Sequence, residues 1–152
     1  MSQSPQVVLE QQQDYRFLVR FDAQPATLLV DETPPLGDGA GPTPSQLLVA
    51  AVANCLGNSL LFALRKFKQS PEPLRSEGRA DIGRNAEGRM RVVALHVTLH
   101  LGVPAAALEH LERVLQQFED FCTVGRSVAQ GIPLHVTVRD SLGRVLKGPA
   151  EA

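Results

Sequence analysis

The sequence has few of the features that mark disulfide-stapled, metal-binding or nucleic-acid-binding proteins. Only two of its 152 residues are cysteines, too few for a disulfide scaffold or for a structural zinc site, which usually needs about four protein ligands. Fifteen lysines and arginines face 16 aspartates and glutamates, so no excess positive charge exists to bind phosphates. We expect no nucleic-acid partner and no metal or other cofactor, and a redox pair of cysteines stays open.

Export and membrane signals are also weak. The first residues lack both the basic start and the apolar run of a secretory signal, which favours the cytoplasm. The most apolar stretch, 47–64, approaches the length of a bilayer span, but polar Asn54, Asn58 and Ser59 interrupt its middle. We expect a buried helix here and no membrane partner.

The patterns that are present predict a small α+β protein. Alternation of apolar and polar residues predicts strands over 14–21, 26–30, 75–83, 89–101 and 132–139. Thr43, Pro44 and Gln46 together form the start of a helix, with a hydroxyl N-cap, a first-turn proline and a capping-box glutamine. A second, amphipathic helix begins at Pro104, and a short helical stretch follows Cys122 and runs to about Gln130.

The first helix is apolar around almost its whole circumference from Thr43 to Phe67. One sheet cannot cover such a helix, so a second layer or a second subunit must, and we favour an interlocked homodimer. We expect one domain over 1–152, with 1–12 poorly ordered or peripheral and 143–152 a tail.

The histidines and the glycine-rich loop give no clear site. His96 and His100 share one strand face, but four residues of strand span about 13 Å, too far for one metal ion. His110 and His135 have no partner visible in the sequence. The glycine-rich run 37–41 precedes a helix without a lysine to meet phosphates, so we interpret it as a connection.

The two cysteines are the informative pair. Cys55 lies in the middle of the apolar helix, where a cysteine taken alone is usually a small hydrophobe. Cys122 precedes a predicted helix N-terminus, where unpaired backbone amides favour a thiolate. Cys122 therefore has a chemical reason for its position.

Three segments together resemble the OsmC/Ohr family, named for osmotically inducible protein C and organic hydroperoxide resistance. They are GPTPSQLL at 41–48, AAVANCL at 50–56 and FCTVGRS at 121–127. The resemblance implies an α+β fold in which antiparallel sheets wrap a central buried helix in an intertwined homodimer.

The resemblance also implies an antioxidant, thiol-dependent peroxidase of the oxidative-stress response. Cys55 would attack an organic hydroperoxide and become a sulfenic acid, and Cys122 would condense with it to a disulfide that a dithiol reductant recycles. An apolar helix suits an apolar hydroperoxide. We place the substrate pocket at Ser45, Leu48, Ala51, Val52 and Ser59.

One departure from the family favours an alternative. Burial raises the pKa of a thiol, and peroxidatic members offset this with an arginine held by a glutamate ten positions before the first cysteine. Here that position is Ser45. Arg16 and Arg20 are candidate catalytic cations, and Glu32 is a candidate carboxylate. The alternative is a non-enzymatic dimer that binds a small apolar ligand or senses redox state.

Overall fold

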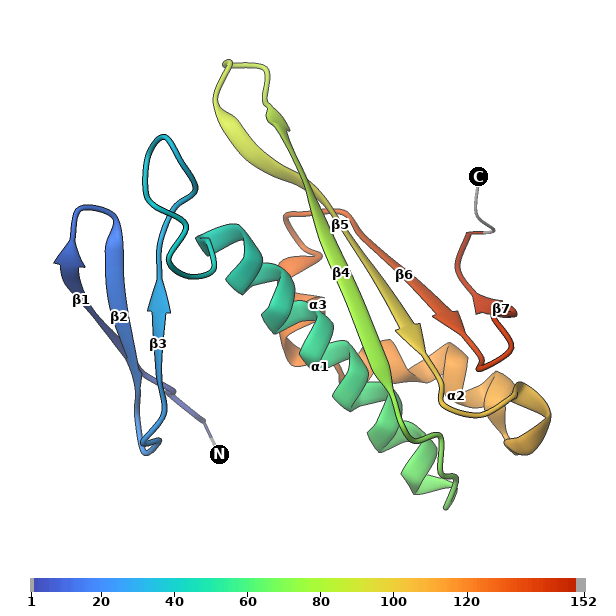
Figure 1. The fold of residues 1–152 in the computed structure, drawn as a ribbon. Coiled ribbons are helices and arrows are strands. Elements are labelled where there is room, and N and C mark those ends of the chain that lie inside the picture. Colours follow the sequence, from blue (N-terminus) through green and yellow to red (C-terminus); the bar gives the residue numbers. More distant parts are fainter. Residues whose placement is uncertain (1, 150–152) are drawn as a thin grey trace. The chain divides into compact units, whose positions relative to one another are not determined.

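The computed structural model describes residues 2–149, which form two compact units, Met1–Leu47 and Leu48–Ala152. Residue 1 and residues 150–152 of the predicted tail lie outside the description. The first unit holds an antiparallel sheet in the order β1-β2-β3 (Figure 1). Its strands are β1 (Val7–Gln13), β2 (Arg16–Phe21) and β3 (Thr27–Val30).

Strand β1 has no counterpart among the predicted strands. All seven of its residues are exposed, and the run from Glu10 to Gln13 is polar throughout. No apolar alternation marks such a strand, because β1 is held by its antiparallel backbone pairing with β2 rather than by burial.

The second unit contains a four-stranded sheet and the helices. The sheet order is β4-β5-β6-β7. The strands are β4 (Arg75–Arg84), β5 (Met90–His100), β6 (Leu134–Arg139) and β7 (Val145–Lys147). Helix α1 (Pro44–Lys66) precedes them, and between β5 and β6 come η1 (Ala105–Ala107), α2 (Leu111–Gln117), η2 (Phe118–Phe121) and α3 (Thr123–Val128). The α+β class with two sheets and a central helix is thereby confirmed.

The predicted start of α1 is confirmed in atomic detail. The Gln46 backbone N–H donates to the Thr43 hydroxyl at 3.2 Å, and the Thr43 backbone N–H donates to Gln46 Oε1 at 2.9 Å. These reciprocal bonds satisfy two backbone donors that a helix start otherwise leaves unpaired.

One stripe of α1 packs into the core of the second unit. Val52, Leu56, Leu60 and Leu64 are at most 1% exposed. They pack with alternate residues of β5 and with buried residues of the segment from α2 to α3; this cluster includes Leu95, Val97, Leu99, Val114, Phe118 and Cys122. All three helices therefore lie on the same face of the sheet (Figure 1).

The rest of α1 is less buried than its composition predicts. The helix is long and apolar enough to cross a membrane, but core helices of soluble proteins are often equally long and apolar. In its most apolar 18-residue window, 44% of the residues are buried within this chain. Ala51 and Phe62, for example, are exposed. A dimer, which was expected to cover the remaining face, is not part of this single-chain structure.

Two expectations about the second unit are wrong in detail. Strands β5 and β6 are parallel, so the sheet is mixed rather than antiparallel. The helical crossover between them returns the chain to the same end of the sheet. The second helix begins at Leu111 instead of Pro104, because Leu108 is extended and His110 adopts a left-handed conformation with φ 60°.

Close packing of α1 on β4 depends on Gly78. A Cβ atom at this position would lie 2.5 Å from Val49 Cγ1, whereas one at Gly83 of the same strand would meet Val93 at an ordinary 3.7 Å. We expect Gly78→Ala to lower the free energy of unfolding by about 1–3 kcal/mol, because overpacking forces the helix away from the sheet.

Urea unfolding provides the measurement, with Gly83→Ala as the matched control. Val49→Ala should restore part of the loss when it is combined with Gly78→Ala. Equal effects of the two glycine substitutions would contradict the close contact.

Candidate active site

Two cysteines that are 67 positions apart (122 − 55) meet in the second unit. Cys55 lies on α1 and is partly exposed, while Cys122 is 1% exposed and forms the N-cap of α3. The Cys55 thiol is near enough to raise the pKa of the Cys122 thiol, and both cysteines are free. The second unit therefore brings the two thiols near each other.

A cavity of about 370 Å³ opens beside Cys55. Its lining consists of Cys55, Asn58, Ser59, Phe62 and Phe121. The first four occupy positions i, i+3, i+4 and i+7 of α1, so they share one face of the helix. Phe121, the last residue of η2, meets Phe62 edge to face with ring centroids 5.4 Å apart. The cavity is thus apolar at the aromatic end and bears a thiol at the other.

Cys122 is held as a neutral thiol. Burial raises its pKa to about 11, and the hydrogen bond with Cys55 acts in the same direction. The Gly125 backbone N–H donates to Cys122 Sγ at 3.2 Å and lowers the pKa, as does the Ser59 hydroxyl, but burial prevails. The backbone amide thus favours the thiolate as expected, but burial outweighs it and Cys122 stays protonated at neutral pH.

Ser59 links the two cysteines. Its hydroxyl donates to the Cys55 backbone carbonyl at 2.8 Å and also interacts with the Cys122 thiol. Ser59 is 5% exposed and lies one turn after Cys55 on α1. It therefore contacts the backbone of one cysteine and the thiol of the other.

The other predicted pocket residues lie elsewhere. Val52 is fully buried in the core, Leu48 is half-buried and Ala51 is exposed, and none of the three lines the cavity in the part of the chain described. The cavity extends from Cys55 toward the C-terminus of α1, not toward its N-terminus. Asn58, Phe62 and Phe121 were missed, although the helical spacing from Cys55 was a signal for the first two.

A family model, described as OsmC-like protein, matches residues 37–137 and so covers both cysteines. The chain belongs to the OsmC-like family. Three solved structures share the fold of this OsmC-like protein at low sequence identity. A comparison with curated proteins found no significant match.

The first of these structures is a putative osmotic stress induced and detoxification response protein from Psychrobacter arcticus, with TM-score 0.74, 16% identity, and coverage of 91% of this chain and 98% of that chain. The second is a putative organic hydroperoxide resistance protein from Vibrio cholerae with captopril in one of its active sites, with TM-score 0.69, 21% identity, and 96% and 97% coverage. The third is the organic hydroperoxide resistance protein OhrB of Bacillus subtilis, with TM-score 0.67, 14% identity, and 90% and 98% coverage.

The first unit of this OsmC-like protein contains an arginine–carboxylate pair in which Arg16 was a predicted candidate but the carboxylate, Asp31, was not. Arg16 Nε lies 3.8 Å from Asp31 Oδ2, and Arg16 Nη2 donates to Asp38 Oδ2 at 3.3 Å. Asp31 is 3% exposed. Hydrogen bonds from the backbone N–H groups of Ala40, Glu32 and Asp38, together with Arg16, hold the pKa of Asp31 below its usual value.

The other predicted site residues of the first unit do not pair with a buried carboxylate as Arg16 does. Arg20 is exposed and pairs with Glu10 at 3.3 Å. Glu32, the predicted carboxylate, contributes its backbone N–H to Asp31. Ser45 is half-exposed in the first turn of α1. Asp31, next to the predicted Glu32, is therefore the buried carboxylate that faces Arg16.

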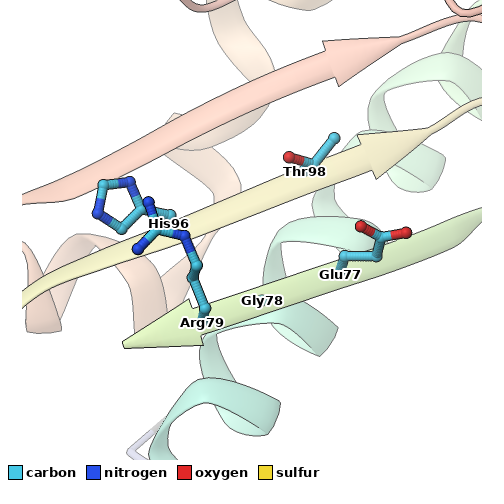
Figure 2. A pocket seen from close by; sticks show the side chains of 5 residues that line it. All are labelled: Glu77, Gly78, Arg79, His96 and Thr98. Carbon is cyan, nitrogen blue, oxygen red and sulfur yellow. The ribbon is translucent and has the colours of Figure 1, made fainter. Parts of the chain in front are cut away.

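A second hollow, of about 270 Å³, lies on the polar face of the four-stranded sheet (Figure 2). Glu77, Arg79, His96 and Thr98 line it. His96 Nε2 lies 2.7 Å from an Asp81 carboxylate oxygen, and its ring stacks on that of His135. Within residues 2–149 no group of three or more His, Cys, Asp or Glu side chains is arranged to hold a metal ion.

The raised pKa of Cys122 predicts a pH dependence of stability. The unfolded chain releases this proton near the ordinary pKa of 9.0, and the folded chain releases it near 11. Between these values the folded state binds more protons, so the free energy of unfolding should fall as pH rises.

Urea unfolding in the presence of a reductant checks this prediction. The fall between about pH 9 and 11 should be shallower in Cys122→Ala than in the unaltered protein, because all other titrating groups are common to both. Parallel curves would contradict the raised pKa.

Proposed function

We propose that this protein reduces organic hydroperoxides with thiol chemistry, using Cys55 and Cys122 as a redox pair. The observation that carries the proposal is the contact between an accessible thiol at an apolar cavity and a second, buried thiol. Membership of the OsmC-like family supports it, as do structural relatives named for organic hydroperoxide resistance.

The proposed reaction proceeds in three steps. The Cys55 thiolate attacks one peroxide oxygen, the S–O bond forms, the O–O bond breaks, and the other oxygen takes up a proton and leaves as an alcohol. The Cys122 sulfur then attacks the Cys55 sulfenic acid, and its proton leaves with the hydroxyl group as water. A dithiol reductant restores both thiols by two exchange steps and is itself oxidised to a disulfide.

Exposure supports the proposed roles of the two cysteines. Cys55 lines the cavity and is partly exposed, so it can meet the hydroperoxide. Cys122 is buried and protonated at neutral pH, so it is a poor first nucleophile but lies where the sulfenic acid forms. The apolar lining favours organic hydroperoxides over hydrogen peroxide, because only the former bury a hydrocarbon tail.

Of the two predicted cations, Arg16 is the stronger candidate for a functional role. It faces the buried Asp31 carboxylate, and its Nε atom is buried without a hydrogen-bond partner in the described chain. A buried donor without a partner is costly, so such groups commonly serve a function. Arg20 is exposed and engaged by Glu10, which makes it the weaker candidate.

A homodimer is proposed for the assembly. Large apolar side chains are exposed at the end of the β4–β5 hairpin, namely Ile82, Met90 and Val93, and α1 keeps an exposed apolar face. Surfaces of this kind mark protein–protein contacts. We place the protein in the cytoplasm, where dithiol reductants are available and where it would act against oxidative stress.

Turnover of cumene hydroperoxide with dithiothreitol tests the redox pair. We expect rapid consumption by the unaltered protein, slow consumption of hydrogen peroxide, and none above background with Cys55→Ser. Cys122→Ser should still form the sulfenic acid, which dimedone traps and mass spectrometry detects. Equal, negligible rates in all variants would leave the non-enzymatic binding or redox-sensing role.

A further inference from the structure

Lys147 of strand β7 contacts the segment that leads to Cys122. Its Nζ atom donates to the Leu115 backbone carbonyl at 2.6 Å and lies 2.5 Å from a Glu119 carboxylate oxygen. The ammonium group also lies over the ring of the fully buried Phe118, 5.1 Å from its centroid. One side chain of the last strand thus contacts both the end of α2 and the beginning of η2.

These contacts suit a cation at this place. Leu115 lies in the last turn of α2, where carbonyl groups lack partners within the helix. An ammonium group can bind such a carbonyl and also interacts favourably with the negative end of the helix dipole. The side chains of Lys147 and Glu119 are 31% and 30% exposed, so water screens their ion pair only in part. The end of α2 is therefore tied to β7 by charge-assisted contacts.

The same contacts reach Cys122 through one turn of the chain. The Cys122 backbone N–H donates to the Glu119 backbone carbonyl at 3.0 Å. The turn η2, Phe118–Phe121, directly precedes Cys122, which in turn forms the N-cap of α3 and accepts from the Gly125 N–H. Lys147 therefore anchors the turn that sets where the Cys122 backbone begins α3.

We propose that Lys147 is a positioning residue that keeps Cys122 ready to capture an oxidised Cys55. This inference rests on the proposed function and adds a control of its second step. Without Lys147 the turn before Cys122 opens more often, and the Cys55 sulfenic acid waits longer for its partner. A second hydroperoxide then oxidises the sulfenic acid to a sulfinic acid and is itself reduced to an alcohol. Strand β7 thus decides between a reversible disulfide and irreversible oxidation.

Thiol labelling of the folded protein tests the position of Cys122 without any hydroperoxide. In a Cys55→Ser background, Ellman's reagent reaches the buried Cys122 only when its segment opens. We expect Lys147→Met to speed this labelling about tenfold, the scale of one hydrogen bond to a charged group. Lys147→Arg should keep it slow, because arginine also donates to a carbonyl and a carboxylate. Low urea concentrations should hardly change the rate, since a local opening exposes little surface.

Arg144→Met is the matched control, since it removes one positive charge from an exposed position just before β7. It should leave the labelling rate unchanged. The proposal is overturned if Lys147→Met does not speed labelling or if Arg144→Met speeds it equally. It is also overturned if the faster labelling rises steeply with urea, because Lys147 would then only stabilise the whole fold.

Oxidation by excess cumene hydroperoxide distinguishes this proposal from the proposed function. With both cysteines present, Lys147→Met should form the sulfenic acid at an unchanged rate but accumulate Cys55 sulfinic acid, which mass spectrometry detects. If no hydroperoxide is reduced but Lys147→Met still speeds labelling, the peroxidase function fails and the positioning of Cys122 by Lys147 stands. If hydroperoxide is reduced and Lys147→Met yields the same disulfide and sulfinic acid as the unaltered protein, the role of Lys147 is overturned.

Discussion

The packing of one stripe of α1 against β5 and the segment from α2 to α3 is the constraint on which the thiol site depends. Leu56 and Leu60, each at most 1% exposed, fix the rotation of α1 about its own axis. Cys55 and Ser59 directly precede these two leucines, so the same rotation aims them at Cys122. A shift of one residue would turn them by about 100° and separate the sulfurs.

Local signals were sufficient to predict most elements but not their pairing. The capping box at Thr43 and the alternation in β2 to β6 are short-range patterns, and the structure has the corresponding elements. The parallel pairing of β5 and β6 depends on how the crossover returns, which no local pattern encodes. Strand β1 and the late start of α2 depend likewise on backbone pairing and on a left-handed residue, His110.

The site shows the same division between local and long-range information. The two cysteine segments were recognisable, and helical spacing from Cys55 indicates Asn58, Ser59 and Phe62. Phe121 enters the cavity only because η2 packs beside α1, and Asp31 approaches Arg16 across two strands. Contacts between elements that are distant in sequence leave no periodic pattern of residues, so Phe121 and Asp31 could not be predicted from the sequence.

Burial makes the two sulfurs chemically unequal, and this inequality gives the proposed cycle its order. A buried Cys122 stays protonated until an electrophilic sulfenic acid forms beside it, so it does not compete for the hydroperoxide. In the first unit, backbone amides, led by that of Ala40, lower the pKa of Asp31, and Arg16 acts in the same direction. The Asp31 carboxylate therefore stays ionised beside Arg16. Although position 45 is a serine, the chain thus contains a buried carboxylate paired with an arginine.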